Sequence, residues 1–157
     1  MSDYISSENY TPEISDIRNV TIAIVQADFN RKYSDELLES CLEELKNSGI
    51  LFKNIQNFLV PGSLEIPAIT RQLQNSGKFS GIITLGIVIK GGTNHYEIVT
   101  EETSRGLMQC SLSSNIPVIN GVLGGNTKSQ IEERLHKGKN FAQGILRMIE
   151  LSKNINS

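Results

Sequence analysis

Gly81-Ile-Ile-Thr-Leu-Gly-Ile-Val-Ile-Lys-Gly-Gly-Thr-Asn-His95 carries the clearest structural pattern in the chain. Its first part is almost continuously apolar, which is the pattern of a strand covered on both faces in a parallel sheet. The strand runs into a glycine-rich loop, and His95 follows where a helix is expected to begin. A glycine-rich backbone at a helix N-terminus can hold an anion, and a histidine can transfer protons near neutral pH. The stretch therefore predicts a site for a phosphorylated small molecule beside a proton-transfer group.

Outward from this stretch, apolar strand patterns alternate with amphipathic helix patterns. The alternation predicts a parallel sheet with helices on both faces and right-handed crossovers. We expect an α/β fold in which residues 19–157 form one three-layer αβα sandwich with a four-stranded parallel, flavodoxin-like sheet, preceded by a polar, extended arm over residues 1–18. The expected strands cover residues 20–27, 55–60, 81–89 and 117–123, and the expected helices begin near residues 34, 64, 95, 127 and 139.

The bulk composition excludes several classes of protein. The chain has 157 residues, 38% of them hydrophobic and 20% charged, which fits one globular domain. Its net charge of −2 provides no basic surplus for a nucleic acid. No apolar run has the length of a membrane span, and no secretory leader pattern is present, so we expect a cytoplasmic protein without a membrane partner. Cys41 and Cys110 fall within helix patterns and are expected to be reduced core thiols rather than a disulfide or metal ligands.

Four loops with chemically useful residues each follow a predicted strand. Because ligands bind outside the carboxyl ends of parallel strands, these loops are expected to meet at one edge of the sheet. Each candidate also has an ordinary explanation. His95 could be a polar cap, Phe29 a core residue at a strand end, Glu65 a carboxylate that favours a helix dipole, and Arg134 a solvated charge. In functional terms, His95 would transfer a proton and Phe29 would stack on a heterocycle. Glu65 would bind a polyol hydroxyl, and Arg134 would make a bidentate contact with a phosphate.

The motifs that these loops carry resemble those of the lumazine synthase family. Val25-Gln-Ala-Asp-Phe-Asn30 is similar to the end of the family's first strand, and Val60-Pro-Gly-Ser-Leu-Glu-Ile-Pro67 to its Val-Pro-Gly-Ala-Phe-Glu-Ile-Pro. Gly86 to Glu97 resembles Gly-x-Val-Ile-Arg-Gly-x-Thr-x-His-Tyr/Phe-Asp/Glu, and Gly121 to Arg134 the segment that ends in Glu-Arg. The resemblance extends from about residue 20 to 151.

The resemblance implies an enzyme, a transferase of riboflavin biosynthesis. It would condense 5-amino-6-(D-ribitylamino)uracil with 3,4-dihydroxy-2-butanone 4-phosphate, giving 6,7-dimethyl-8-ribityllumazine, phosphate and water, without a metal or organic cofactor. It also implies roles for individual residues: His95 as the catalytic proton-transfer residue; Phe29 and Asn120 at the ring; Ser63, Leu64 and Glu65 at the ribityl chain; the backbone of Ile87, Val88 and Ile89 at the uracil edge; and Gly92, Thr93, Arg134 and Lys137 at the phosphate.

Several positions depart from the family pattern. Leu64 replaces a phenylalanine, Asn120 an apolar or aromatic residue, and Gly124-Gly125 a common Thr-Thr pair. The segment after Arg134 is shorter than the glycine-rich loop of many members, which favours a free pentamer over an icosahedral cage. Residues 1–18 are long enough to lie along the sheet of an adjacent subunit.

Two other functions stay open at this point. One is a non-catalytic flavin- or lumazine-binding protein on the same scaffold, and the other is a protein that forms a shell. The resemblance further implies a homopentamer and an association with riboflavin synthase.

Overall fold

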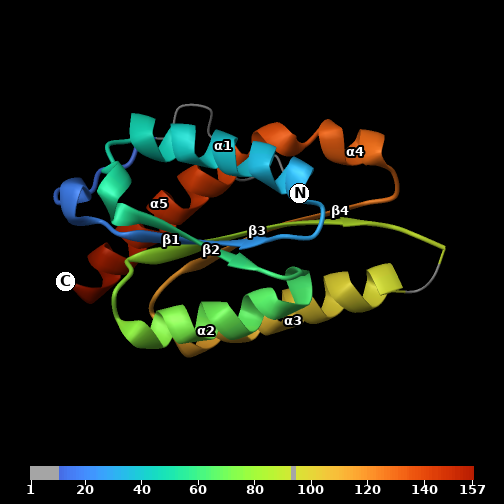
Figure 1. Cartoon of the computed structure of the whole chain (residues 1–157). Coiled ribbons are helices and arrows are strands. Elements are labelled where there is room, and N and C mark those ends of the chain that lie inside the picture. The colour runs from blue at the N-terminus through green and yellow to red at the C-terminus, as the bar shows by residue number, and fades with distance from the viewer. Residues whose placement is uncertain (1–10, 93–94) are drawn as a thin grey trace.

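The computed structural model describes residues 11–92 and 95–157, and its sheet has four parallel strands in the order β2-β1-β3-β4. The predicted α/β fold is confirmed (Figure 1). The strands are β1 (Ile22–Ala27), β2 (Ile55–Val60), β3 (Gly81–Ile89) and β4 (Val118–Gly125). The helices are α1 (Arg31–Asn47), α2 (Ile66–Ser76), α3 (His95–Ser113), α4 (Lys128–Glu132) and α5 (Gly138–Asn156).

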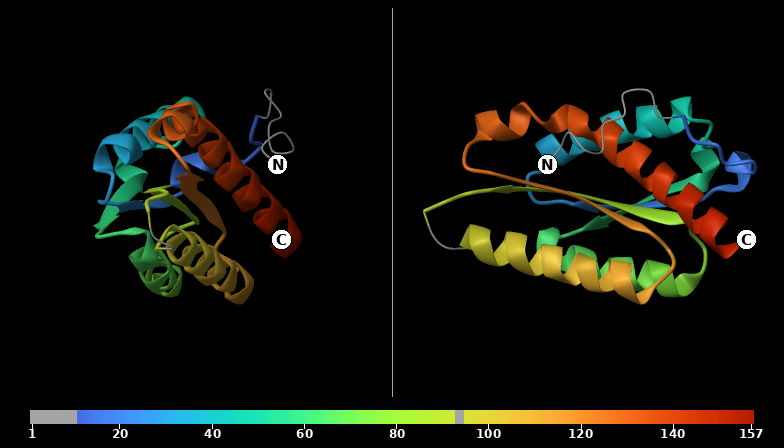
Figure 2. Two further views of the ribbon diagram at one scale, coloured as in Figure 1. Left: turned by 90° about the vertical axis from the view of Figure 1, so that its right-hand side faces the viewer. Right: turned by 180° about the vertical axis from the view of Figure 1, so that it is seen from behind.

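The helices form one layer on each face of the sheet. Helices α1, α4 and α5 cover one face and α2 and α3 cover the other (Figures 1 and 2). All four strands end on the right in Figure 1, where α3 and α4 begin. The loops that carry the candidate site residues therefore meet at this edge, as the sequence predicts.

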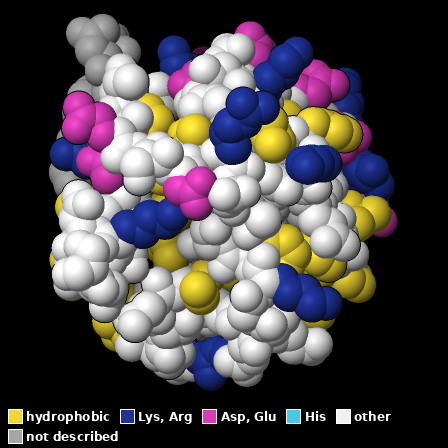
Figure 3. All heavy atoms as spheres, turned by 90° about the vertical axis from the view of Figure 1, so that its left-hand side faces the viewer, with side chains coloured by type: hydrophobic (Ala, Val, Ile, Leu, Met, Phe, Trp, Pro, Cys, Tyr) yellow, Lys and Arg dark blue, Asp and Glu magenta, His cyan; other side chains and the backbone are white. Residues whose placement is uncertain are grey.

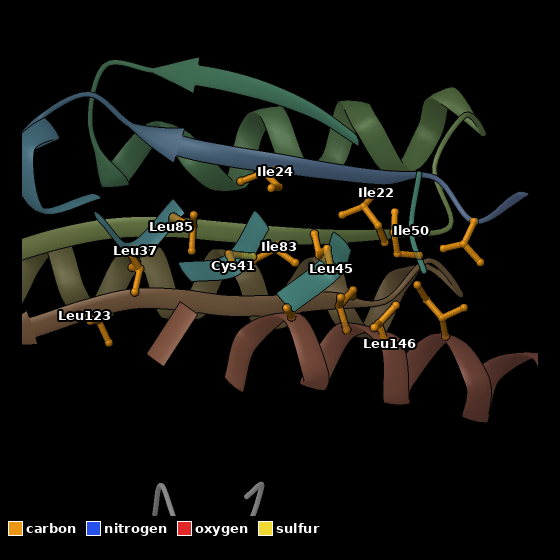
Figure 4. Packing of buried hydrophobic residues seen from close by; sticks show 14 of the residues in the cluster. Ile22, Ile24, Leu37, Cys41, Leu45, Ile50, Ile83, Leu85, Leu123 and Leu146 are labelled. Carbon is orange, nitrogen blue, oxygen red and sulfur yellow. The ribbon is translucent and has the colours of Figure 1, made fainter. Parts of the chain in front are cut away.

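The sheet separates two apolar clusters, because successive side chains of a strand point to opposite faces. Ile22 and Ile24 of β1 pack in the cluster under α1 and α5, together with Ile83 and Leu85 of β3 (Figure 4). Ala23 and Val25 lie in the smaller cluster under α2 and α3. Strands buried on both faces explain why the first and third strand patterns read as continuous apolar runs.

The helix starts differ from the predicted positions for local reasons. Helix α1 begins at Arg31 rather than near residue 34, because Asn30 takes a left-handed conformation (φ 61°) and its carbonyl accepts the first helical hydrogen bonds, from Tyr33 and Ser34. The predicted second helix begins as the single 3-10 turn η4 (Ser63–Glu65), and Pro67 lies in the first turn of α2. Proline is tolerated there because that N–H has no helical acceptor.

Helix α4 begins where the sequence predicts a helix near residue 127, and Thr127 is its N-cap. The Thr127 hydroxyl accepts a hydrogen bond from the Gln130 N–H at 3.2 Å, and the Gln130 side chain accepts one from the Asn126 N–H at 2.7 Å. Helix α4 nevertheless ends at Glu132, and a 3-10 turn, η5 (Leu135–Lys137), leads directly into α5. The short connection lets Gly138 lie against the α1 backbone, where a Cβ would collide with the Leu37 carbonyl and approach the Cys41 nitrogen to 2.8 Å.

The segment before β1 is only partly an extended arm. Ile14 is buried in the cluster under α1 and α5, the Glu13 N–H donates to the Glu150 carboxylate at 2.8 Å, and residues 17–19 form the 3-10 turn η2. Ile14 and Ile17 therefore attach this part of the predicted arm to the chain's own core. Residues 1–10 lie outside the described residues.

The two cysteines are buried, as predicted, and neither forms a disulfide. Burial raises the pKa of the Cys41 thiol to about 12. In the described part of the chain, no helix combines the length and apolar character that a membrane span requires.

Candidate active site

A pocket of about 490 Å³ opens at the carboxyl edge of the sheet. We call it the larger pocket. It is built from the ends of three strands together with the start of α3. Its lining residues are Phe29, Pro61, Gly62, Ser63, Leu64, Glu65, Ile87, Val88, Ile89, Gly91, His95, Tyr96 and Val99.

The floor of the larger pocket is the last part of β3. Its pairing with β1 ends at Gln26–Leu85, whereas its pairing with β4 continues to Ile89–Gly125. Beyond Leu85 the backbone on the β1 side therefore has no strand partner. One group there is satisfied by a side chain, since the Asn30 amide donates to the Ile87 carbonyl at 3.0 Å. The remaining backbone groups can hydrogen-bond the edge of a planar heterocycle.

One wall is the turn after β2. Ser63 is buried, and its hydroxyl lies so close to β3 that a Cβ at Gly86 would come within 2.6 Å of it. Gly86 therefore allows the η4 turn to approach the strand. Leu64 and Glu65 are exposed on the same turn, where a carboxylate and an apolar side chain face the pocket.

The opposite walls carry Phe29 and His95. Phe29 is 72% exposed, and its backbone N–H donates to the Pro61 carbonyl at 3.1 Å, which ties the loop after β1 to the end of β2. A phenylalanine left so exposed at the mouth of a pocket offers a flat apolar surface for a ring. His95 is the first residue of α3, and its side chain is exposed at the pocket.

A second, smaller pocket of about 330 Å³ lies beside the first, at the end of β4. Arg134 dominates its chemistry. The guanidinium donates from Nε to the Gln130 carbonyl at 3.2 Å and from Nη2 to the Gly124 carbonyl. An arginine has five N–H groups, so three remain for an anion. The other lining residues are Tyr96, Gly124, Gly125, Asn126, Gln130 and Glu133.

Most of the predicted site residues come together in these pockets, but three do not. Gly92, Asn120 and Lys137 line neither of them. Asn120 is exposed on β4, five residues before the strand ends, and its side chain accepts a hydrogen bond from the Val122 N–H at 3.0 Å. Lys137 is half-buried in η5. Thr93 lies outside the described residues.

The structure also adds residues that received no role from the sequence. Pro61, Gly62, Gly91 and Val99 line the larger pocket, and Tyr96 lines both pockets. Tyr96 follows His95 within the His-Tyr-Glu motif, so its position carried a signal. Its contact with the end of β4 depends on the tertiary structure and could not be read from the spacing.

Within residues 11–92 and 95–157 no group of three or more His, Cys, Asp or Glu side chains is placed to hold a metal ion. The titratable groups that line the two pockets are one histidine, one tyrosine, one arginine and two carboxylates, those of Glu65 and Glu133. Such a set can orient an anion and a planar ring and can transfer a proton between them.

Comparison with known proteins agrees with this geometry. Residues 19–153 match the family model of 6,7-dimethyl-8-ribityllumazine synthase. A 6,7-dimethyl-8-ribityllumazine synthase of Leuconostoc mesenteroides is 37% identical over 153 residues, which cover 94% of this chain and 98% of that protein. One of Cupriavidus metallidurans is 36% identical over 137 residues, covering 87% and 81% of the two chains. The chain therefore belongs to the 6,7-dimethyl-8-ribityllumazine synthase family.

Proposed function

We propose that this chain is a transferase that condenses 5-amino-6-(D-ribitylamino)uracil with 3,4-dihydroxy-2-butanone 4-phosphate. The products are 6,7-dimethyl-8-ribityllumazine, phosphate and water, the penultimate step of riboflavin biosynthesis. The observation that carries the proposal is the pair of adjacent pockets at one sheet edge, one flat and apolar with a histidine, the other built around an arginine. Two substrates, a ring and a phosphorylated ketone, fit such a pair.

The ring substrate is assigned to the larger pocket. Phe29 would stack on the pyrimidine, and the backbone groups of Ile87 to Ile89 that Asn30 and β4 leave unpaired would bind its polar edge. The η4 turn, with Ser63, Leu64 and Glu65, would hold the ribityl chain through its hydroxyl and carboxylate.

The phosphorylated ketone is assigned to the smaller pocket. Three N–H groups of the Arg134 guanidinium are available to its phosphate. Gly92, Thr93 and Lys137 stay predicted phosphate contacts from the family motif. Gly92 and Lys137 do not line the smaller pocket of a single chain, and Thr93 lies outside the described residues.

The chemistry needs little from the protein beyond orientation and proton transfer. The amine of the ring substrate is the nucleophile, and phosphate is the leaving group. Holding both reactants in contact removes much of the entropic cost of their encounter. His95 lies on the ring pocket next to the loop that leads from β3, where it would accept a proton from the amine and return it to a leaving oxygen.

Mixing both substrates with the purified protein tests this function. The lumazine product is fluorescent, so its appearance above the uncatalysed rate supports the condensation. Tight lumazine binding without turnover would instead support the non-catalytic binding protein, and would overturn the proposal.

We also propose that the chain works as a free homopentamer. One side of α3 exposes three large apolar side chains, those of Ile98, Met108 and Leu112. This exposure favours a subunit interface on that side of the helix. Asn120, exposed away from its own pockets, could then contact the ring bound by a neighbour. Native mass spectrometry tests this: a dominant pentamer supports it, and a cage or an active monomer contradicts it. A cytoplasmic location and an association with riboflavin synthase stay predictions.

A further inference from the structure

Gln26 is a fully buried polar residue in an otherwise apolar strand. It is the fifth of the six residues of β1, all of which are buried. Because Ile24 packs under α1 and the side chains of a strand alternate between faces, Gln26 faces α1 as well. Burial of an amide costs free energy unless its groups are hydrogen-bonded, whereas an apolar side chain of that size carries no such cost. The partners of the amide therefore explain its place in the core.

Both ends of the Gln26 amide are hydrogen-bonded. Its Nε2 donates to the Ser34 hydroxyl at 2.9 Å and to the Asp35 carboxylate at 2.7 Å, both near the start of α1. Its Oε1 accepts a hydrogen bond from the side-chain amide of Asn57 on β2 at 2.9 Å. The bond from Gln26 is the largest cause of the lowered pKa of Asp35. The side chain thus joins two strands to the start of α1.

One route leads from Gln26 through Ser34 to the end of β1. The Ser34 hydroxyl shares its hydrogen between the carbonyls of Ala27, at 3.2 Å, and Arg31, at 3.3 Å. Ala27 is the last residue of β1 and stands two residues before Phe29. The position of the chain where it leaves the sheet therefore depends on a hydroxyl that the buried amide orients.

A second route leads from Gln26 through Asp35 to the turn itself. The Asp35 oxygen that accepts from Gln26 also accepts from the Arg31 Nε at 3.0 Å. The Arg31 Nη1 donates in turn to the carboxylate of Asp28 at 3.3 Å. These ion pairs are about half exposed, and such pairs contribute little to stability by themselves. What fixes this one in place is the bond of Asp35 to the buried amide.

The turn that these routes reach carries Phe29. Because Phe29 is 72% exposed, its ring is placed mainly by the backbone of the turn. The next residue, Asn30, has φ 61°, a conformation that a residue other than glycine keeps only where its surroundings favour it. The Phe29 N–H is bonded to the Pro61 carbonyl on the β2 side. The hydrogen bonds of Gln26 hold the turn on the α1 side.

We propose that Gln26 is a positioning residue, which through Ser34 and Asp35 sets the turn after β1 and thereby the place of the Phe29 ring. The inference rests on the proposed function, in which that ring stacks on the pyrimidine. Gln26 itself lines neither pocket, so it acts on the ring substrate only through the turn. Ring binding then depends on a residue buried behind the site.

Gln26→Met tests the proposal, because it removes the amide and keeps the length of the side chain. The KM of the ring substrate should rise about threefold to fivefold, a part of the effect of losing the stacking surface altogether. The kcat and the ketone KM should stay within about twofold, because no group that touches the reacting atoms changes. Deuterium uptake by residues 28–31 should become faster, a readout that does not require activity.

A double-mutant cycle with Phe29→Ala separates positioning from a general loss of stability. If Gln26 acts through Phe29, Gln26→Met should not raise the ring KM further in a Phe29→Ala background. An equal rise in both backgrounds would overturn the proposal. Asp35→Ala is a second variant that keeps the core intact, because Asp35 is half exposed. It breaks only the second route, so it should raise the ring KM by a smaller factor than Gln26→Met.

Gln74→Met is the matched control, since Gln74 is also a buried glutamine. Its Nε2 donates to the carbonyls of Cys110 and Ile116 at 2.9 and 3.1 Å, and it lies near the last turn of α2, away from both pockets. It should lower the melting temperature and leave both KM values unchanged.

The outcomes separate the two proposals. An active wild type whose Gln26→Met variant keeps its ring KM would overturn the assignment of Gln26 alone. Absence of lumazine formation by the wild type would overturn the proposed function. Deuterium uptake by residues 28–31 would then still test whether Gln26 holds the turn, and unchanged uptake in Gln26→Met would overturn that as well.

Discussion

The two pockets at the sheet edge differ in how they are built. The larger pocket has a backbone floor, an exposed phenylalanine and a turn whose Ser63 lies against β3 because Gly86 has no side chain. The smaller pocket is polar, and its one cation is partly occupied by carbonyl groups of its own chain. One pocket selects by shape and the other by charge.

Because the two pockets are built differently, the KM values of the two substrates should respond to different substitutions. A change in the larger pocket should alter the KM of the ring substrate, and a change in the smaller pocket should alter the KM of the phosphorylated ketone. A group that serves the reaction rather than either substrate should change kcat. Figure 3 shows the opposite end of the molecule, where positive and negative side chains are interspersed with small apolar areas and no histidine is visible.

His95 should give the largest effect, because it serves the reaction itself. His95→Ala should lower kcat by about 10²–10⁴-fold, the usual contribution of a positioned proton-transfer residue. Both KM values should change much less. Initial rates of lumazine formation, corrected for the uncatalysed condensation, measure this effect.

His136→Ala is the matched control for His95→Ala. His136 is exposed on η5 and lines neither pocket, and its backbone carbonyl accepts hydrogen bonds from the Ser40 hydroxyl at 3.0 Å and from the Gly138 N–H. This variant should keep the wild-type kcat. A folded His95→Ala protein with unchanged turnover would remove His95 from the mechanism.

Substitution of Arg134 should distinguish the roles of the two pockets most clearly, because it should change the KM of one substrate only. Arg134→Ala should raise the ketone KM by about 10- to 100-fold, since a hydrogen bond to a charged group contributes about 1.5–3 kcal/mol. The KM of the ring substrate should stay within about threefold. Steady-state kinetics with each substrate varied in turn measure the split.

Arg71→Ala, on the exposed face of α2, provides the comparison for loss of a positive charge alone. It should leave both KM values unchanged. If Arg134→Ala raised both KM values equally, Arg134 would hold the end of β4 in place instead of binding phosphate.

The sequence predicted the sheet, its layers and most of the larger pocket because strand ends and glycine-rich loops are local features. Phe29, Glu65 and His95 each follow a strand or open a helix, and parallel strands bring such positions to one edge. The boundaries it missed depend on single backbone conformations, such as the left-handed Asn30 that starts α1 early.

Contacts between layers could not be read in the same way. That Tyr96 and Arg134 meet at Gly124 from opposite faces of the sheet depends on how α3 and α4 pack, which no spacing encodes. The sequence did not predict the packing of the N-terminal segment for the same reason. A single isoleucine, Ile14, in a polar stretch forms no helix or strand periodicity that would indicate burial.

Phe29 tests the larger pocket. Phe29→Ala should raise the KM of the ring substrate by about tenfold, because stacking of a base on an aromatic side chain contributes about 1–3 kcal/mol. The ketone KM should be unaffected. Phe52→Ala is the control, since Phe52 is a still more exposed phenylalanine (82%) that lines a different pocket, away from both substrates. A Phe29→Ala enzyme with an unaltered ring KM would show that the phenylalanine is not a stacking surface.

Substitution of Asn120 should give the smallest change in KM. It tests whether the larger pocket is complete within one chain. Asn120 lines neither pocket of its own chain, so it can contact the ring only from a neighbouring subunit. If it does, Asn120→Ala should raise the KM of the ring substrate about threefold, the size of one ordinary hydrogen bond, and leave the ketone KM unchanged. Asn115→Ala is the control, because Asn115 is exposed just before β4 at the far end of the strand. Because the Asn120 side chain also accepts the Val122 N–H, thermal unfolding must be compared between the two variants. A ring KM that stays at the wild-type value in a stable Asn120→Ala oligomer would mean that the ring is held by the larger pocket of one chain alone.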